Sequence, residues 1–263
     1  MEKIICLENV SKSYDGNFVL DHITHEFYKG ESIAFTGHNG CGKSTLLKIL
    51  AGLIRTSSGI VSYPAKTGFS YVPEKFPGMD IVMTDYLYSV AGMESADRSV
   101  ADGLISDFFL ESMTHTKLNE LSKGSLQKVG VIQALIAPKD VILLDEPLSG
   151  QDAASQEVFL KKINALRERG VTVFMSCHEK KLIDALSDHE YTIDHGKLHL
   201  KDNEDTISVF KIYIRRDEKL TPWPEMSAHI RGFVLEVKRD TLKETVMKLY
   251  NDGWELAGIE EYI

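Results

Sequence analysis

A glycine-rich segment near the N-terminus constrains the fold of this chain more than any other feature. It reads Gly37-His38-Asn39-Gly40-Cys41-Gly42-Lys43-Ser44-Thr45, with two glycines five positions apart followed by lysine and serine. An apolar strand pattern over 31–36 precedes it, and a helical pattern over 43–53 follows. Glycines let backbone N–H groups turn inward at the start of the helix, where they can surround an anion. The segment therefore predicts a phosphate-binding loop in an α/β domain.

The last residues of this loop have distinct expected roles. Lys43 is placed to reach the β- and γ-phosphates of a nucleoside triphosphate, and Ser44 to offer its hydroxyl to Mg²⁺. The alternative is a glycine-rich turn without a ligand. The flanking strand and helix favour the phosphate-binding interpretation. We therefore expect every residue of 37–45 to contact the nucleotide.

A second motif places two acids at the end of an apolar run. Val141–Leu144 predicts a buried strand, and Asp145 and Glu146 follow it directly. Open α/β sheets bind ligands at the carboxyl ends of their strands, so both carboxylates are expected beside the phosphate loop. Asp145 would hold Mg²⁺ through water. Glu146 would accept a proton from an attacking water, a role worth about 10²–10⁴-fold in rate. Solvated acids at a strand end are the alternative.

Composition narrows the class of protein. The chain has 263 residues, 43% of them hydrophobic, and a formal net charge of −9, which argues against nucleic acid as a partner. Its three cysteines are too few and too scattered for a disulfide framework. No apolar run approaches the roughly 20 residues that a spanning helix needs, and no signal peptide is recognisable.

The order of the patterns predicts two domains. Strands and helices alternate over residues 1–204, with an irregular helical part at about 76–138. A polar run at 201–205 is typical of a linker. Residues 205–263 predict a small β–β–α–β unit, in which Thr241-Leu242-Lys243-Glu244 forms a capping box that opens the helix.

Further motifs produce a family resemblance. Leu121-Ser122-Lys123-Gly124-Ser125-Leu126-Gln127 resembles the Leu-Ser-Gly-Gly-Gln signature of the ATP-binding cassette (ABC) ATPases, and Ser149-Gly150-Gln151-Asp152 resembles their D-loop. His178 lies where that family has its switch histidine, and Tyr14 where it has an aromatic that stacks on adenine. With the phosphate loop and the paired acids, the resemblance covers about Ile4 to Leu200.

The resemblance implies a fold and an activity. The fold would be a P-loop NTPase core with a mixed sheet, an antiparallel β subdomain and a short helical subdomain. The activity would be ATP hydrolysis with Mg²⁺, with Glu146 and His178 catalytic. Tyr14 and Asp152 would contact nucleotide, although Tyr14 could also be an ordinary strand-edge aromatic, with Phe18 as its rival.

The resemblance also implies partners. Two copies would stack head to tail, so that Ser122 and Gly124 of one chain close the nucleotide site of the other. A separate integral membrane permease would seat a short helix in a groove near residues 76–87. The complex would work at the cytoplasmic face of a bacterial membrane.

Three residues depart from the family pattern. Lys123 replaces the first glycine of the signature, which would cause strain if that position required φ > 0, and Ser125 stands in place of its glutamine. Glu74 stands where the family usually has glutamine; it keeps an oxygen for Mg²⁺ and favours an exporter. An importer subunit, a weakly hydrolysing regulatory or immunity protein, and a cassette acting on nucleic acid or ribosomes are the alternatives.

Overall fold

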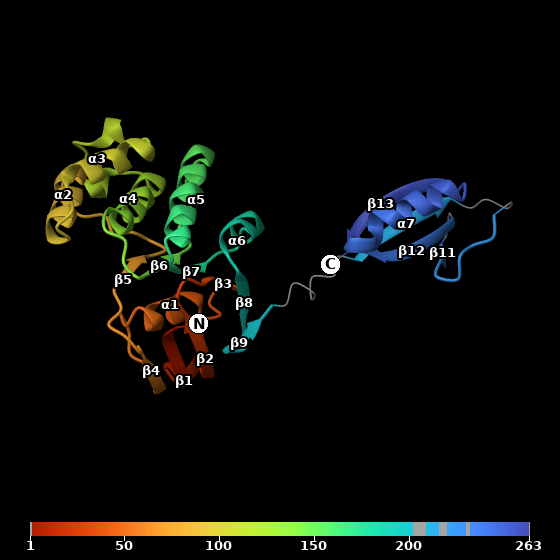
Figure 1. Ribbon diagram of the computed structural model, residues 1–263, viewed down its shortest axis with the longest axis horizontal. Coiled ribbons are helices and arrows are strands. Elements are labelled where there is room, and N and C mark those ends of the chain that lie inside the picture. Colours follow the sequence, from red (N-terminus) through yellow and green to blue (C-terminus); the bar gives the residue numbers. More distant parts are fainter. Residues whose placement is uncertain (1, 202–208, 216–219, 230–231, 263) are drawn as a thin grey trace. The chain divides into compact units, whose positions relative to one another are not determined.

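The computed structural model describes residues 2–201, 209–215, 220–229 and 232–262. The chain forms two compact units, Met1–Leu200 and Lys201–Ile263 (Figure 1). The predicted boundary at 204–205, and most of the predicted linker, lie outside the described residues.

A six-stranded sheet forms the centre of the first unit. Its strand order is β5-β6-β7-β3-β8-β9, and only β9 runs antiparallel to its neighbour. β6 and β7 are buried along their whole length, as their continuous apolar runs predict. The predicted mixed sheet is therefore confirmed. The strands are β3 (Ser32–Thr36), β5 (Phe69–Val72), β6 (Val141–Asp145), β7 (Thr172–Ser176), β8 (His189–Asp194) and β9 (Lys197–Leu200).

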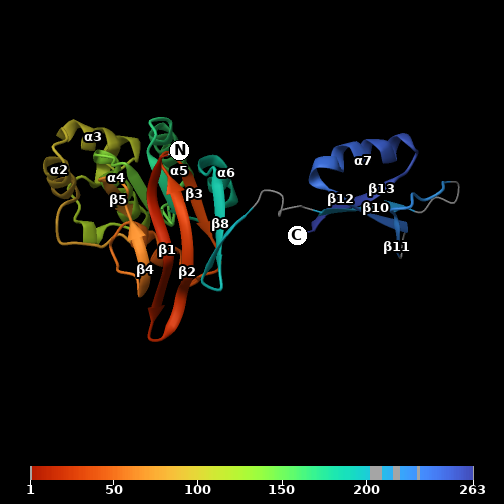
Figure 2. The same ribbon diagram turned by 60° about the horizontal axis from the view of Figure 1, so that its bottom comes forward.

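A second sheet, of order β2-β1-β4, is wholly antiparallel and is clearly visible in Figure 2. It comprises β1 (Lys3–Tyr14), β2 (Asn17–Tyr28) and β4 (Ser58–Ser62). β1 and β2 are each twelve residues long, and bulges that interrupt their register break the alternation of polar and apolar residues along them. One apolar core joins both sheets to helix α1 (Lys43–Leu50); in it, Phe27 packs edge-on against Phe174.

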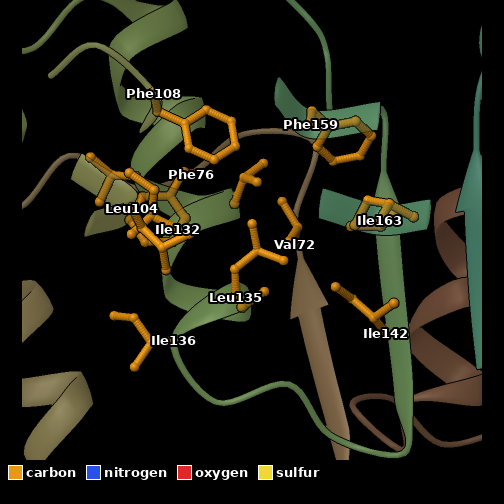
Figure 3. Packing of buried hydrophobic residues seen from close by; sticks show 14 of the residues in the cluster. Val72, Phe76, Leu104, Phe108, Ile132, Leu135, Ile136, Ile142, Phe159 and Ile163 are labelled. Atoms are coloured by element: carbon orange, nitrogen blue, oxygen red, sulfur yellow. The ribbon is translucent and has the colours of Figure 1, made fainter. Parts of the chain in front are cut away.

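Five further helices complete this unit: α2 (Met83–Met93), α3 (Arg98–Asp107), α4 (Lys123–Ile136), α5 (Ala153–Glu168) and α6 (Lys180–Leu186). α2, α3 and α4 group together near β5, with the short 3₁₀ turns Glu111–Met113 and Leu118–Glu120 between α3 and α4 (Figure 1). Their apolar faces share a core with the sheet and α5, where Phe108 and Phe159 are fully buried (Figure 3). The predicted helical part is therefore an integral portion of the core.

The second unit is a four-stranded antiparallel sheet of order β11-β12-β10-β13, with α7 (Arg239–Asn251) packed on it. Its strands are β10 (Val209–Arg215), β11 (Ser227–His229), β12 (Gly232–Lys238) and β13 (Leu256–Tyr262). The small sheet is present as predicted, with β11 in addition. β11 has only three residues, all exposed, and so carries no alternation that a sequence pattern could reveal. α7 begins before the predicted capping box because β12 leads straight into it.

None of the helices in the described part of the chain combines the length and apolar character that crossing a bilayer requires.

Candidate active site

The glycine-rich loop connects β3 to α1 and requires its glycines. Gly37, Gly40 and Gly42 have φ of 133°, 83° and 115°, a region that side chains with a Cβ rarely adopt. Space is also restricted: a Cβ on Gly37 would lie 2.6 Å from the carbonyl oxygen of Ile193. The loop can therefore bring its backbone close to a ligand only with glycine at these positions.

Lys43 places a buried cation inside this loop. Its side chain is largely enclosed, and Nζ donates to the carbonyl oxygens of Gly37 at 2.9 Å and His38 at 3.3 Å. Both of these partners are neutral, so the ammonium charge is not cancelled by them. The loop is thus prepared for an anion, since backbone N–H groups and an ammonium group converge at the start of α1.

A cavity of about 580 Å³ opens beside the loop. Nine of the residues predicted for the site line it, together with Val19 and Ser149, which the sequence patterns did not single out as ligands. The predicted residues are Asn39, Gly40, Gly42, Lys43, Ser44, Thr45, Glu74, Glu146 and His178. Residues from both sequence motifs, although about 100 positions apart, therefore share one cavity.

Asp145 lies buried at the end of β6 and is held by three hydroxyl groups. Ser44 Oγ and Ser176 Oγ donate to Oδ1 at 2.9 and 2.7 Å, and Tyr71 OH donates to Oδ2 at 3.1 Å. Burial, and then the charge of Asp145, raise the pKa of Tyr71, so this phenol stays a donor. These three partners are neutral and leave the carboxylate charge uncompensated. A hydroxyl and a carboxylate oxygen together fit a hard cation such as Mg²⁺. Neither Tyr71 nor Ser176 was predicted, because a donor to a buried acid has no sequence pattern.

Glu146 follows Asp145 in an unusual backbone conformation. Its φ is 47°, and its N–H group donates to the backbone oxygen of Ser176 at 3.2 Å and to Ser176 Oγ at 3.0 Å. Glu146 Oε1 lies 3.2 Å from His178 Nε2. Burial raises the pKa of Glu146, while the charges of His178 and Lys43 act in the opposite direction. A carboxyl group with a raised pKa beside a histidine is suited to proton transfer.

The other predicted site residues do not line this cavity. Ser122 caps α4 and accepts from the N–H group of Ser125 at 3.2 Å. α4 therefore begins at Lys123, and Lys123 has helical rather than left-handed backbone. The strain considered for this position is absent.

Asp152 is engaged within its own chain. It caps α5 and forms an ion pair of 2.7 Å with Lys128, which lowers the pKa of Asp152.

Tyr14 ends β1 and is 47% exposed, with Lys12 Nζ 5.0 Å from its ring centre. Gly37, His38 and Cys41 shape the loop without lining the cavity, and Gly124 packs against Gly150.

Comparison with known proteins decides the family. Residues 20–149 match the pattern of the family described as ABC transporter. An ABC transporter ATP-binding protein of Methanocaldococcus jannaschii, itself uncharacterised, is 34% identical over 202 residues, which cover 75% of this chain and 76% of that protein. The chain belongs to the ABC transporter ATP-binding proteins. As a member of this family it is an ATPase.

Two relatives of this ABC protein carry names that state a cargo. The zinc import ATP-binding protein ZnuC of Vibrio vulnificus is 32% identical over 74% of this chain and 75% of its own. The aliphatic sulfonates import ATP-binding protein SsuB 1 of Streptomyces avermitilis is 30% identical over 72% of this chain and 73% of its own. Both are named for import, so they do not support the expectation of export drawn from Glu74.

Solved structures confirm the fold of the ABC domain. A cassette described as the dimeric structure of a post-hydrolysis state bound to ADP and Pi superposes with a TM-score of 0.67 and 21% identity, covering 74% of this chain and 96% of that one.

Proposed function

We propose that this chain is the motor subunit of a membrane transporter: it binds ATP with Mg²⁺, closes on a second copy, hydrolyses ATP and drives a separate permease. The observation that carries the proposal is the convergence of Lys43, Ser44, Glu146 and His178 on one cavity. This convergence provides an anion-binding loop and a proton acceptor in the same place.

The binding roles follow from the contacts of each residue. Lys43 would exchange its two carbonyl acceptors for phosphate oxygens, which form stronger, charge-assisted hydrogen bonds. Ser44 Oγ and Asp145 Oδ1, 2.9 Å apart, would hold Mg²⁺, with Glu74 on the same cavity wall. When bound, Mg²⁺ would neutralise charge on the phosphates.

Glu146 would act as the general base. Its backbone is held at the end of β6, where its N–H group donates to both the carbonyl oxygen and Oγ of Ser176. His178 would keep the carboxylate of Glu146 oriented and more acidic than burial alone allows. The attacking water would lose its proton to Glu146 as its oxygen bonds to the γ-phosphorus. The bond from that phosphorus to the β–γ bridging oxygen would break at the same time, and ADP and phosphate would be released.

A second copy would supply the two predicted nucleotide contacts, Ser122 and Gly124, that are missing from the cavity. Ser122 and Gly124, at the N-terminal turn of α4, do not line the nucleotide cavity of their own chain. A helix N-terminus attracts negative charge, so the start of α4 suits the triphosphate of a partner. This arrangement agrees with the dimeric form in which one solved cassette of this fold is described.

The permease would dock on a second cavity of about 260 Å³ between β5, α2 and α4. Its walls carry the aromatic ring of Tyr86, the exposed side chain of Met93 and the amide of Gln133, which accepts a hydrogen bond from Tyr86. Mixed apolar and polar lining suits a short amphipathic helix. Of the residues that line this cavity, only Tyr86 lies within the expected stretch 76–87, and the others lie in 69–71, 90–94 and 133–139.

For the direction of transport we propose import, at the cytoplasmic face of the membrane, because the two relatives described above are named for import. Their cargoes, zinc and sulfonates, differ, so no cargo is proposed. Export, suggested by Glu74, is the second candidate.

The test measures hydrolysis and dimer formation on the full chain. Purified protein should release phosphate from ATP only with Mg²⁺. The Glu146→Gln form should lose about 10²–10⁴-fold in rate and form ATP-dependent dimers in light scattering, whereas the same form without ATP stays monomeric. Wild-type turnover no faster than that of Glu146→Gln would contradict the motor function and favour a regulatory protein. Transport direction in vesicles, with the permease that co-purifies, separates import from export.

A further inference from the structure

The start of α4 contacts the segment 149–152 at three successive points. Lys123 Nζ donates to Ser149 Oγ at 3.0 Å. Gly124 lies so close to Gly150 that a Cβ on Gly124 would be 2.2 Å from the carbonyl oxygen of Gly150. One turn further along, Lys128 Nζ lies 2.7 Å from Asp152 Oδ2.

The third contact anchors the other two. Lys128 is largely buried, with 9% of its side chain exposed, and it also donates to the carbonyl oxygen of Phe108 at 3.3 Å. Asp152 in turn caps α5. A buried lysine paired in this way is expensive to displace, because its charge would lose its partner. Both ends of segment 149–152, Ser149 and Asp152, are therefore bonded to lysine side chains of α4.

The segment leads directly into the nucleotide cavity. Ser149 lines the cavity, and its N–H group donates to the carbonyl oxygen of Glu146 at 3.2 Å. The side chain of Lys123 thus connects the exposed end of α4 to the residue three positions after the general base. A glycine at position 123 has no side chain and could not form this hydrogen bond to Ser149.

The direction of the hydrogen bond matters for chemistry. An ammonium group has only donors, so Ser149 Oγ is the acceptor of the bond from Lys123. The hydroxyl proton of Ser149 then remains available for an acceptor in the cavity, and the bond from a cation makes that hydroxyl a stronger donor.

We propose that Lys123 is a positioning residue for ATP hydrolysis that acts through Ser149, holding the hydroxyl of Ser149 toward the reacting groups beside Glu146. The inference rests on the proposed function. The proposal assigns a role to Lys123, which stands where the family signature has its first glycine. The competing role is direct contact of Lys123 with a triphosphate.

A double-mutant cycle on the full chain separates the two roles. Steady-state ATP hydrolysis is measured for wild type, Lys123→Ala, Ser149→Ala, the double variant and Lys123→Arg. Loss of one hydrogen bond should lower kcat by about 2- to 10-fold in either single variant, with little change in KM for ATP. The double variant should match Ser149→Ala alone, and Lys123→Arg should regain most of the lost rate.

The controls keep the outcomes distinct. Lys161→Ala, which removes an exposed lysine of α5, should leave both constants unchanged. Thermal unfolding of each variant identifies any loss of folding, and for a variant that unfolds, Lys123→Met in place of alanine preserves the packing of the stem. Equal losses from Lys123→Ala in both backgrounds, a rise in KM that persists without Ser149, or no effect of Lys123→Ala would overturn the inference. A wild-type protein that does not hydrolyse ATP would instead overturn the proposed function.

Discussion

His178 Nε2 lies 3.2 Å from Glu146 Oε1, although the two residues belong to different strand ends. β6 and β7 are neighbouring parallel strands, with Asp145 opposite Ser176. Residues just beyond that pair leave the sheet at the same edge, so a carboxylate and an imidazole meet there. The register of two buried strands therefore brings the proposed general base, Glu146, within reach of His178.

The pH dependence of activity should shift when this histidine is removed. Burial raises the pKa of Glu146, and the charge of His178 lowers it. A general base works when ionised, so activity is lost as pH falls through its pKa. In His178→Ala that pKa rises further, and the acid limb of the kcat/KM profile should move to higher pH. The exposed His115, replaced by alanine, is the control and should leave the limb in place. An unchanged limb in His178→Ala would show that the two groups are not coupled.

Magnesium dependence should follow the hydroxyl of Ser44. Ser44→Ala removes the donor 2.9 Å from Asp145 Oδ1 and one oxygen of the expected Mg²⁺ site. The Mg²⁺ concentration for half-maximal ATP hydrolysis should rise by about tenfold, the size of effect expected from one lost ligand or its supporting contact. Ser44→Thr keeps the hydroxyl and should stay near wild type. Equal Mg²⁺ requirements for the alanine and threonine forms would contradict this assignment.

Two glycine-to-alanine changes should have opposite effects on stability. Alanine at position 124 would place a Cβ 2.2 Å from the backbone oxygen of Gly150, forcing the segment away, at a cost of about 1–3 kcal/mol. Gly103, inside α3, has no atom within 4 Å of such a Cβ, so alanine there should stabilise the helix by about 0.5–1 kcal/mol. Thermal and urea unfolding measure both. ATP hydrolysis should fall only in Gly124→Ala. A Gly124→Ala form as stable as the wild type would contradict this prediction, because it would show that segment 149–152 can move away from the added Cβ.

A charge in the cavity between β5, α2 and α4, the proposed docking groove for the permease, should weaken permease binding without stopping ATP hydrolysis. Met93 is 77% exposed at the end of α2 and lines this groove, so Met93→Glu should fold normally. We expect permease binding to weaken by about tenfold, as for a typical interface hot spot. Basal ATP hydrolysis should persist. Met247→Glu, an exposed methionine of α7, is the matched control. Retention of the permease by Met93→Glu would place the docking surface elsewhere.

The sequence by itself determined the fold class, the glycine-rich loop and the two acids after an apolar strand. These features depend on local physics: glycine is required where φ is positive, as at Gly42, and an uninterrupted apolar run such as Val141–Leu144 can only be a buried strand in this context. Each such signal lies within a few neighbouring residues, so no knowledge of distant contacts was needed.

Only the tertiary structure decided which residues surround those motifs. Tyr71 and Ser176 hold Asp145 because their strands flank β6. Ser149, which lines the cavity, accepts a hydrogen bond from Lys123 of α4. These partners come from strand order and helix packing, which join residues far apart in the chain. A hydroxyl that donates to a buried acid looks like any other serine or tyrosine until the fold brings the two together.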